Sequence, residues 1–156
     1  MGKFNRLLDA TYTPPKKWVL NASLSFDCDQ LTEKDIQNLK TVGVKVTKNG
    51  RVTVPKGFVT DMASVPRVLW NIIAPFDVAR AAVIHDILYK NIRDYLGDNG
   101  TDARMIMENA MDAKKVADKI FLYAMESLDP PIPTWKRQAC YLAVKFFGKS
   151  SCMPLT

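Results

Sequence analysis

The spacing of apolar residues changes once along this 156-residue chain, near Val65. Before that point, short runs such as Val42–Val46 and Arg51–Val54 alternate between apolar and polar residues, a period of two that is typical of β-strands. After it, apolar residues recur every three or four positions, which is typical of helices. The sequence therefore predicts an α+β fold in which strands come first and helices follow.

Residues 1–64 are predicted to form the β-rich part of the fold, with a small antiparallel sheet. Asn49-Gly50 separates two alternating runs, and this pair is a strong signal for a β-hairpin. Another strand is expected within Trp18–Phe26. One short helix is expected at Thr32–Lys40, because Thr32 can cap its first turn and Asp35 suits its positive end.

Residues 65–156 are predicted to form the helical part, with three to four helices. The expected helices are Val65–Ile73, Val78–Leu96, Asp102–Leu128 and Trp135–Phe147, separated by segments rich in proline or glycine. The two long helices are joined by a short turn containing glycine, so we expect them to lie antiparallel. With 47% apolar residues, a chain of this length is expected to fold as one domain over residues 1–156.

The composition narrows the classes of function. The net charge of +6 is spread over scattered lysines, which favours a solvated surface over a specific nucleic-acid site. No run approaches the roughly 18 apolar residues that span a bilayer, and the first residues lack the apolar core of an export signal. Three widely spaced cysteines without a C-x-x-C pair argue against a disulfide framework or a cysteine-based zinc site, and favour a reducing compartment.

The only histidine, His85, lies in the apolar stripe of a predicted helix, where a titratable ring is costly. Asp118 interrupts a second apolar stripe in the same way on the next long helix. If the two met, the carboxylate would fix one ring nitrogen and leave the other to take a proton from water, as in a general-base pair. Tyr89 and Asp86 lie close to His85 and extend this polar cluster. The structural alternative is a core histidine that is bonded to the backbone or to a buried carboxylate.

The segment Pro55–Arg67 is a second dense group of polar residues. Asp61 could be an acidic metal ligand, and Arg67 could bind an anionic substrate. Ser64 lacks the G-x-S-x-G setting of an activated nucleophile, so we predict that it contacts substrate alongside Arg67. In the structural alternative, Asp61 or Ser64 caps a helix that Pro66 opens.

Four motifs resemble a family of small proteins found in bacteriophages and prophages, domain of unknown function family 1353. They are P-K-G-F-V-T-D-M-A-S-V-P-R, A-A-V-I-H-D-I-L-Y, A-D-K-I-F and Y-L-A-V-K-F-F-G, and they cover roughly Val54–Gly148. The resemblance implies a phage origin, synthesis in the host cytoplasm and incorporation into the virion as a further option. Other virion proteins are then expected partners.

The pattern His85-Asp86-x-x-Tyr89, followed by Ala117-Asp118-x-x-Phe121, is also similar to the paired-helix site of secreted and parvoviral phospholipases of the type-two A class. This resemblance implies that His85 and Asp118 form a water-activating dyad, that Tyr89 supports it, and that Asp86 binds calcium. Phospholipases of this class also have a glycine-rich calcium loop, whereas residues 70–76 here contain no glycine. Asp61 could replace part of that loop as a second metal ligand.

Three functions follow as hypotheses. The first is a phage-encoded hydrolase of a cell-envelope ester or amide, with phospholipid as the favoured substrate and His85 as the base. The second is a noncatalytic virion or assembly protein that binds other phage proteins through its β-rich part. The third is a peptide or peptidoglycan hydrolase that holds a divalent metal ion on Asp61, His85 and Asp86.

Overall fold

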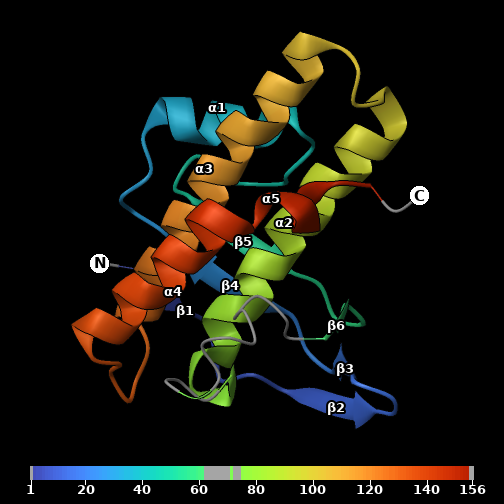
Figure 1. The fold of residues 1–156 in the computed structure, drawn as a ribbon. Coiled ribbons are helices and arrows are strands. Elements are labelled where there is room, and N and C mark those ends of the chain that lie inside the picture. Colours follow the sequence, from blue (N-terminus) through green and yellow to red (C-terminus); the bar gives the residue numbers. More distant parts are fainter. Residues whose placement is uncertain (1, 62–70, 72–74, 155–156) are drawn as a thin grey trace.

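The computed structural model describes residues 2–61, 71 and 75–154, and it has strands first and helices after them (Figure 1). The α+β prediction is therefore confirmed. The strands are β1 (Lys3–Phe4), β2 (Ala10–Thr13), β3 (Lys17–Leu20), β4 (Leu24–Asp27), β5 (Arg51–Val54) and β6 (Val59–Thr60). The helices are α1 (Glu33–Thr41), the 3-10 turn η2 (Pro75–Val78), α2 (Ala79–Asn99), α3 (Arg104–Glu126), α4 (Thr134–Phe147) and α5 (Lys149–Cys152).

The strands form two small antiparallel sheets, ordered β1-β4-β5 and β2-β3-β6. In the first sheet, Leu24 pairs with Val54 and Phe26 pairs with Val52, and all four side chains are buried. In β5 these buried positions alternate with exposed ones, as the period of two requires. This buried face packs against α2, and buried residues of the first sheet, α2 and α3 form one core.

The predicted hairpin is wrong in its first strand. The run Val42–Val46 contributes only a single bridge, from Val46 to Val52, and the main partner of β5 is β4. The backbone of this run is used instead to end α1, since the Val44 N–H donates to the Leu39 carbonyl at 3.1 Å. The alternating valines are nevertheless buried. The period of two therefore indicated which side chains are buried, although the segment does not form a strand.

Two local predictions in the β-rich part are confirmed. Thr32 caps α1 in a capping box: the Asp35 N–H donates to the Thr32 hydroxyl, and the Thr32 N–H donates to the Asp35 carboxylate, each at 3.1 Å. The turn at Asn49-Gly50 also forms, with Gly50 at φ +79°. A side chain at Gly50 would in addition collide with the backbone of Cys28, so glycine is required there twice over.

The long helices α2 and α3 run in opposite directions and pack together (Figure 1). Helix α2 continues past Gly97, where the sequence predicted a break, and ends at Gly100, which has φ +80° and donates to the Leu96 carbonyl at 2.8 Å. The short helix α5 was not predicted. The helix predicted at Val65–Ile73 lies outside the described residues, apart from Asn71.

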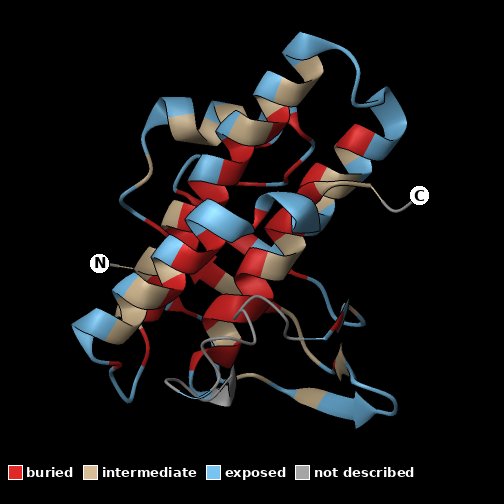
Figure 2. Ribbon diagram, in the orientation of Figure 1, coloured by how far each residue is buried: buried red, intermediate tan, exposed pale blue. Residues whose placement is uncertain are grey.

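Buried residues line the inner sides of the helices and the first sheet, while the outer turns are exposed (Figure 2). Phe26 of the sheet and Phe121 of α3 are among the largest side chains that are fully buried. Within the described part of the chain, none of the helices is both long enough and apolar enough to span a membrane.

Candidate active site

The antiparallel packing of α2 and α3 brings the two interrupted stripes together. His85 Nε2 lies 2.9 Å from Asp118 Oδ1, and the His85 side chain is 0% exposed. His85 stacks on Phe121 at 4.7 Å between ring centroids, with an interplanar angle of 28°, which fixes the plane of the imidazole. The contact that the sequence predicted is present, whereas its catalytic role stays a prediction.

Asp118 accepts hydrogen bonds from two further side chains. The Tyr89 hydroxyl donates to Oδ1 at 2.6 Å, and Lys114 Nζ donates to Oδ2 at 2.8 Å. Lys114 also donates to the carbonyls of Val144, at 2.9 Å, and Lys145, at 3.3 Å, near the end of α4. The carboxylate thus joins α2 to α3 directly, and Lys114 joins both to α4.

The sequence reasoning did not assign Lys114 to the site. A signal was available, because Lys114 lies four residues before Asp118 in the same apolar stripe, the spacing at which two side chains meet on a helix. A buried carboxylate and a buried ammonium each need a partner, and here they supply it to one another.

The surroundings set the ionisation of these groups. Burial alone would raise the pKa of Asp118, but its interaction with His85 and the hydrogen bonds from Lys114 and Tyr89 outweigh burial and hold the pKa below its usual range. Burial first, and then the neighbouring Asp118 charge, raise the pKa of Tyr89 well above its usual value. The carboxylate is therefore ionised and the phenol neutral at physiological pH.

Unlike Nε2 of His85, which contacts Asp118, the Nδ1 atom has no hydrogen-bond partner among the described residues. This nitrogen is also buried. Because the ionised Asp118 is an acceptor only, the proton of a neutral imidazole is best placed on Nε2, which leaves the Nδ1 lone pair free to accept a proton. This is the protonation state that a general base requires.

His85 borders a pocket of about 630 Å³ between α2, the C-terminal part of α4, α5 and strand β6. Its apolar walls include Phe58, Val59, Ala143, Val144, Phe147 and Met153. Positively charged side chains, Lys17, Lys90 and Arg93, also line it, together with Asp61, Asp86 and Tyr89. Apolar walls with a few polar groups are typical of small-molecule sites, so this pocket is the candidate active site.

The two predicted metal ligands line the same pocket. The Thr60 hydroxyl donates a short hydrogen bond to Asp86 Oδ2, and the neighbouring Asp61 is exposed. Calcium takes six to eight oxygen ligands. Among the residues that the structure describes, no three His, Cys, Asp or Glu side chains are grouped as a metal site would require. The described donors therefore do not fit the calcium site that the phospholipase resemblance implies.

Ser64 and Arg67, the predicted substrate-binding residues, lie outside the described residues.

Gly148 is a further residue at the site that sequence reasoning missed. It is buried where α4 ends, and a Cβ atom there would lie 2.4 Å from the Tyr89 hydroxyl oxygen. Its backbone φ of −80° is open to any residue, so the close approach is what requires glycine. Gly148 thus lets the end of α4 close against the hydrogen-bonded cluster.

The cysteines offer no nucleophile to this site. All three are free and buried. Burial raises the pKa of Cys28 and Cys140 to about 11 and that of Cys152 to about 12, so the thiols are neutral and poor nucleophiles.

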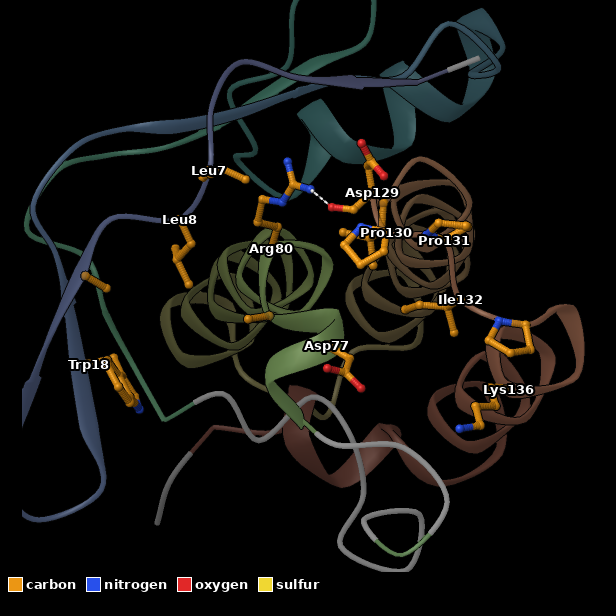
Figure 3. Close-up of a pocket in the computed structure, with 14 residues that line it drawn as sticks. Leu7, Leu8, Trp18, Asp77, Arg80, Asp129, Pro130, Pro131, Ile132 and Lys136 are labelled. Carbon is orange, nitrogen blue, oxygen red and sulfur yellow. Dashed lines mark hydrogen bonds between the residues drawn. The ribbon is translucent and has the colours of Figure 1, made fainter.

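A second pocket, of about 580 Å³, lies between the N-terminal strands and the segment that joins α3 to α4 (Figure 3). Arg80 donates to the backbone carbonyl of Asp129 at 3.4 Å on one side, and Trp18 and Lys136 lie on two other sides. The remaining walls are mainly leucine, isoleucine and proline. None of the predicted site residues that the structure describes lines this pocket, so it carries no part of the proposed chemistry.

The fold and the site together describe a small α+β protein in which two antiparallel helices hold a histidine–aspartate pair beside a pocket. Residues 38–144 match the family model described as "Protein of unknown function (DUF1353)". The chain therefore belongs to this family, as its motifs suggested. Comparisons with curated proteins and with solved structures found no match.

Proposed function

We propose that this chain is a phage-encoded hydrolase in which His85 activates water for attack on an ester or amide of the cell envelope. One observation carries the proposal: Asp118 holds Nε2 of His85, while Nδ1 has no partner among the described residues and the ring borders the pocket. The resemblance to type-two A phospholipases supports the same roles for His85, Asp118 and Tyr89, and the family motifs support the phage origin.

The proposed reaction needs no covalent enzyme intermediate. Nδ1 of His85 takes a proton from water as the water oxygen bonds to the carbonyl carbon. The imidazolium that forms is stabilised by the ionised Asp118, which Tyr89 and Lys114 keep in place. The imidazolium then returns the proton to the leaving oxygen or nitrogen as its bond to the carbonyl carbon breaks.

The lining of the pocket favours phospholipid among the envelope substrates. Apolar walls suit acyl chains, and the positive side chains at the pocket suit a phosphate group. Lys90 forms an ion pair with Asp94 at 2.7 Å, and Arg93 donates to the Ser151 carbonyl at 2.8 Å, so both are already held in place. Lys17, an exposed residue at the start of β3, is the third cation that lines the pocket and could contact an anionic headgroup.

Calcium remains a separate part of the proposal. The described donors do not form a calcium site by themselves, so the reaction above uses no metal. Asp86 and Asp61 are the described carboxylates that would hold the ion if it binds, and it would supply positive charge for a developing oxyanion. Isothermal titration of calcium into the wild-type chain and into Asp86→Asn tests this directly. Binding that disappears in Asp86→Asn supports a metal-assisted hydrolase, and a flat titration with retained turnover supports hydrolysis by the His85 pair alone.

The main test is turnover of phosphatidylglycerol and of a soluble short-chain ester. We expect His85→Gln to lower kcat by roughly 10²–10⁴-fold, because the amide cannot act as a base. Tyr89→Phe should have a smaller effect, and Tyr95→Phe on the same helix is the matched control, since its hydroxyl contacts Asn109 away from the pocket. Equal activity of wild type and His85→Gln, with both folded by circular dichroism, would refute the proposal.

A second function is favoured by a different observation, the complete burial of the cluster and its three-helix connection through Lys114. Such a network is also what a noncatalytic virion or assembly protein would need to hold its helices in one arrangement. In that case the protein is found stoichiometrically in purified particles, no substrate is turned over, and phage carrying a folded His85→Gln variant infect normally.

A further inference from the structure

The outer face of α4 carries large apolar side chains that are exposed in the described part of the chain. Leu142 follows Trp135 by seven residues and Phe146 follows it by eleven, so the three side chains lie on one face of the helix. Phe147 follows at the end of α4. These four side chains are between 45% and 76% exposed. Figure 2 shows α4 with its outer side exposed to solvent. We call these four residues the α4 patch.

Positive charge surrounds the α4 patch. Residues 130–156 contain four basic residues, Lys136, Arg137, Lys145 and Lys149, and no acidic residue. Two of the lysines lie over the exposed rings: Lys136 Nζ is 5.6 Å from the Trp135 ring centroid, and Lys145 Nζ is 5.7 Å from that of Phe146. The apolar and cationic groups therefore form a single surface.

We propose that the α4 patch docks on the surface of a bilayer that contains anionic phospholipid. Exposed tryptophan, phenylalanine and leucine insert at the boundary between headgroups and acyl chains, and lysines beside them attract an anionic headgroup layer. A nucleic acid would use the lysines and the rings but not Leu142, whose aliphatic side chain offers no stacking surface. The charge pattern also disfavours a second copy of this face, because the lysines around one patch would meet the lysines around the other.

Phe147 links this surface to the candidate active site, because it belongs to the α4 patch and also lines the pocket that His85 borders. A bilayer seated on α4 would thus lie at the mouth of that pocket. The delivery of lipid to His85 rests on the proposed hydrolase function. The docking itself does not.

The test is binding to vesicles of ether-linked lipid, which cannot be hydrolysed at an acyl ester. Wild-type protein should co-sediment with vesicles that mix phosphatidylglycerol and phosphatidylcholine, and much less with phosphatidylcholine alone. The double variant Trp135→Gln/Phe146→Gln should lower the partition coefficient at least about tenfold. Met105→Gln is the control, because this side chain is equally exposed, 72%, at the start of α3.

A second pair of variants tests the charge. Lys145→Gln/Lys149→Gln should weaken binding at least about tenfold, and about 0.5 M NaCl should have a similar effect on the wild type. Lys34→Gln/Lys48→Gln removes two exposed lysines from the N-terminal half and should leave binding nearly unchanged.

Three outcomes would overturn the inference: equal binding to both kinds of vesicle, equal loss in the α4 and control variants, or a wild-type dimer in light scattering that Trp135→Gln/Phe146→Gln dissociates. The proposed hydrolase function fails separately. A His85→Gln protein that binds vesicles as the wild type does, alongside a wild type that hydrolyses no soluble ester, would refute the hydrolase and leave the docking in place.

Discussion

Helix α3 carries two lysine–aspartate ion pairs of nearly the same length in different surroundings. Lys114 Nζ lies 2.8 Å from Asp118 Oδ2, and these side chains are 8% and 3% exposed. Lys119 Nζ lies 2.9 Å from Asp35 Oδ2, and these side chains are 35% and 13% exposed. The distances are alike, so only the surroundings can make the two pairs differ in their effect on stability.

Each pair also has a different task. Lys119 connects α3 to the capping box of α1, where water can replace much of what a mutation removes. Asp118 and Lys114 connect α2, α3 and α4 around His85, and both side chains are almost fully buried. Removing one partner of a buried pair leaves an uncompensated charge, whereas exposed pairs contribute about 0–1 kcal/mol. The comparison therefore predicts unequal losses from equal substitutions.

The largest expected effect is that of Asp118→Asn. The amide keeps the shape of the carboxylate but leaves Lys114 with a buried positive charge, so the free energy of unfolding should fall by about 3–5 kcal/mol. Urea denaturation followed by circular dichroism measures it. Asp35→Asn is the matched substitution, and it should lose about 1 kcal/mol. Equal losses would show that burial does not separate the two pairs.

Gly148→Ala tests how tightly the buried cluster is packed. Its new Cβ would lie 2.4 Å from both the Tyr89 hydroxyl oxygen and the Val144 carbonyl oxygen, so the tyrosine and the end of α4 must both move, and we expect a loss of about 1–3 kcal/mol. The same substitution at Gly97, inside α2, meets nothing closer than Pro154 at 3.9 Å. Gly97→Ala should therefore stabilise the protein, by up to about 1 kcal/mol. If both substitutions stabilise it, the cluster is looser than the structure shows.

The loss of stability at acid pH should also differ between Asp118 and Asp35, but by less than the losses above. The pKa of each is lower in the folded protein than its usual value of 3.8. A lowered pKa contributes stability that is present above about pH 4 and is lost as the pH falls through the folded-state value. Urea denaturation between about pH 6 and pH 3 should show a shallower acid limb in Asp118→Asn than in Asp35→Asn, since Asp118 has more donors to lose. A steeper limb in Asp118→Asn would contradict the assigned ionisation.

The sequence predicted most of the helical half because its signals there are local. The stripes of α2 and α3 located His85 and Asp118 on facing helices, and the residue types at the start of α1 identified Thr32 as its cap. What it missed depends on contacts between distant segments. Gly148 matters only because α4 closes on Tyr89, and the valines after α1 alternate as a strand would while their backbone ends a helix.

Lys114 shows the same limit within one helix. Its spacing from Asp118 was visible in the sequence, but such pairs are common on exposed faces, as Lys90–Asp94 shows in α2. Only the burial of the stripe by α2 and α4 makes the pair part of the site. Burial is a property of the assembled fold, so the sequence did not reveal Lys114 as a third hydrogen-bond donor to Asp118, beside His85 and Tyr89.

The smallest effect belongs to the partly exposed pair, Lys119 and Asp35, and a double-mutant cycle measures it against the buried pair. For Lys119→Gln and Asp35→Asn we expect a coupling energy of about 0.5–1 kcal/mol, which should shrink in about 1 M NaCl because solvent ions screen an exposed pair. The corresponding cycle on Lys114 and Asp118 should give a larger coupling that the same salt leaves nearly unchanged, because ions cannot enter the buried cluster. If salt weakens both couplings equally, water reaches Asp118, and Nδ1 of His85 then lies in a wetter site than the buried cluster implies.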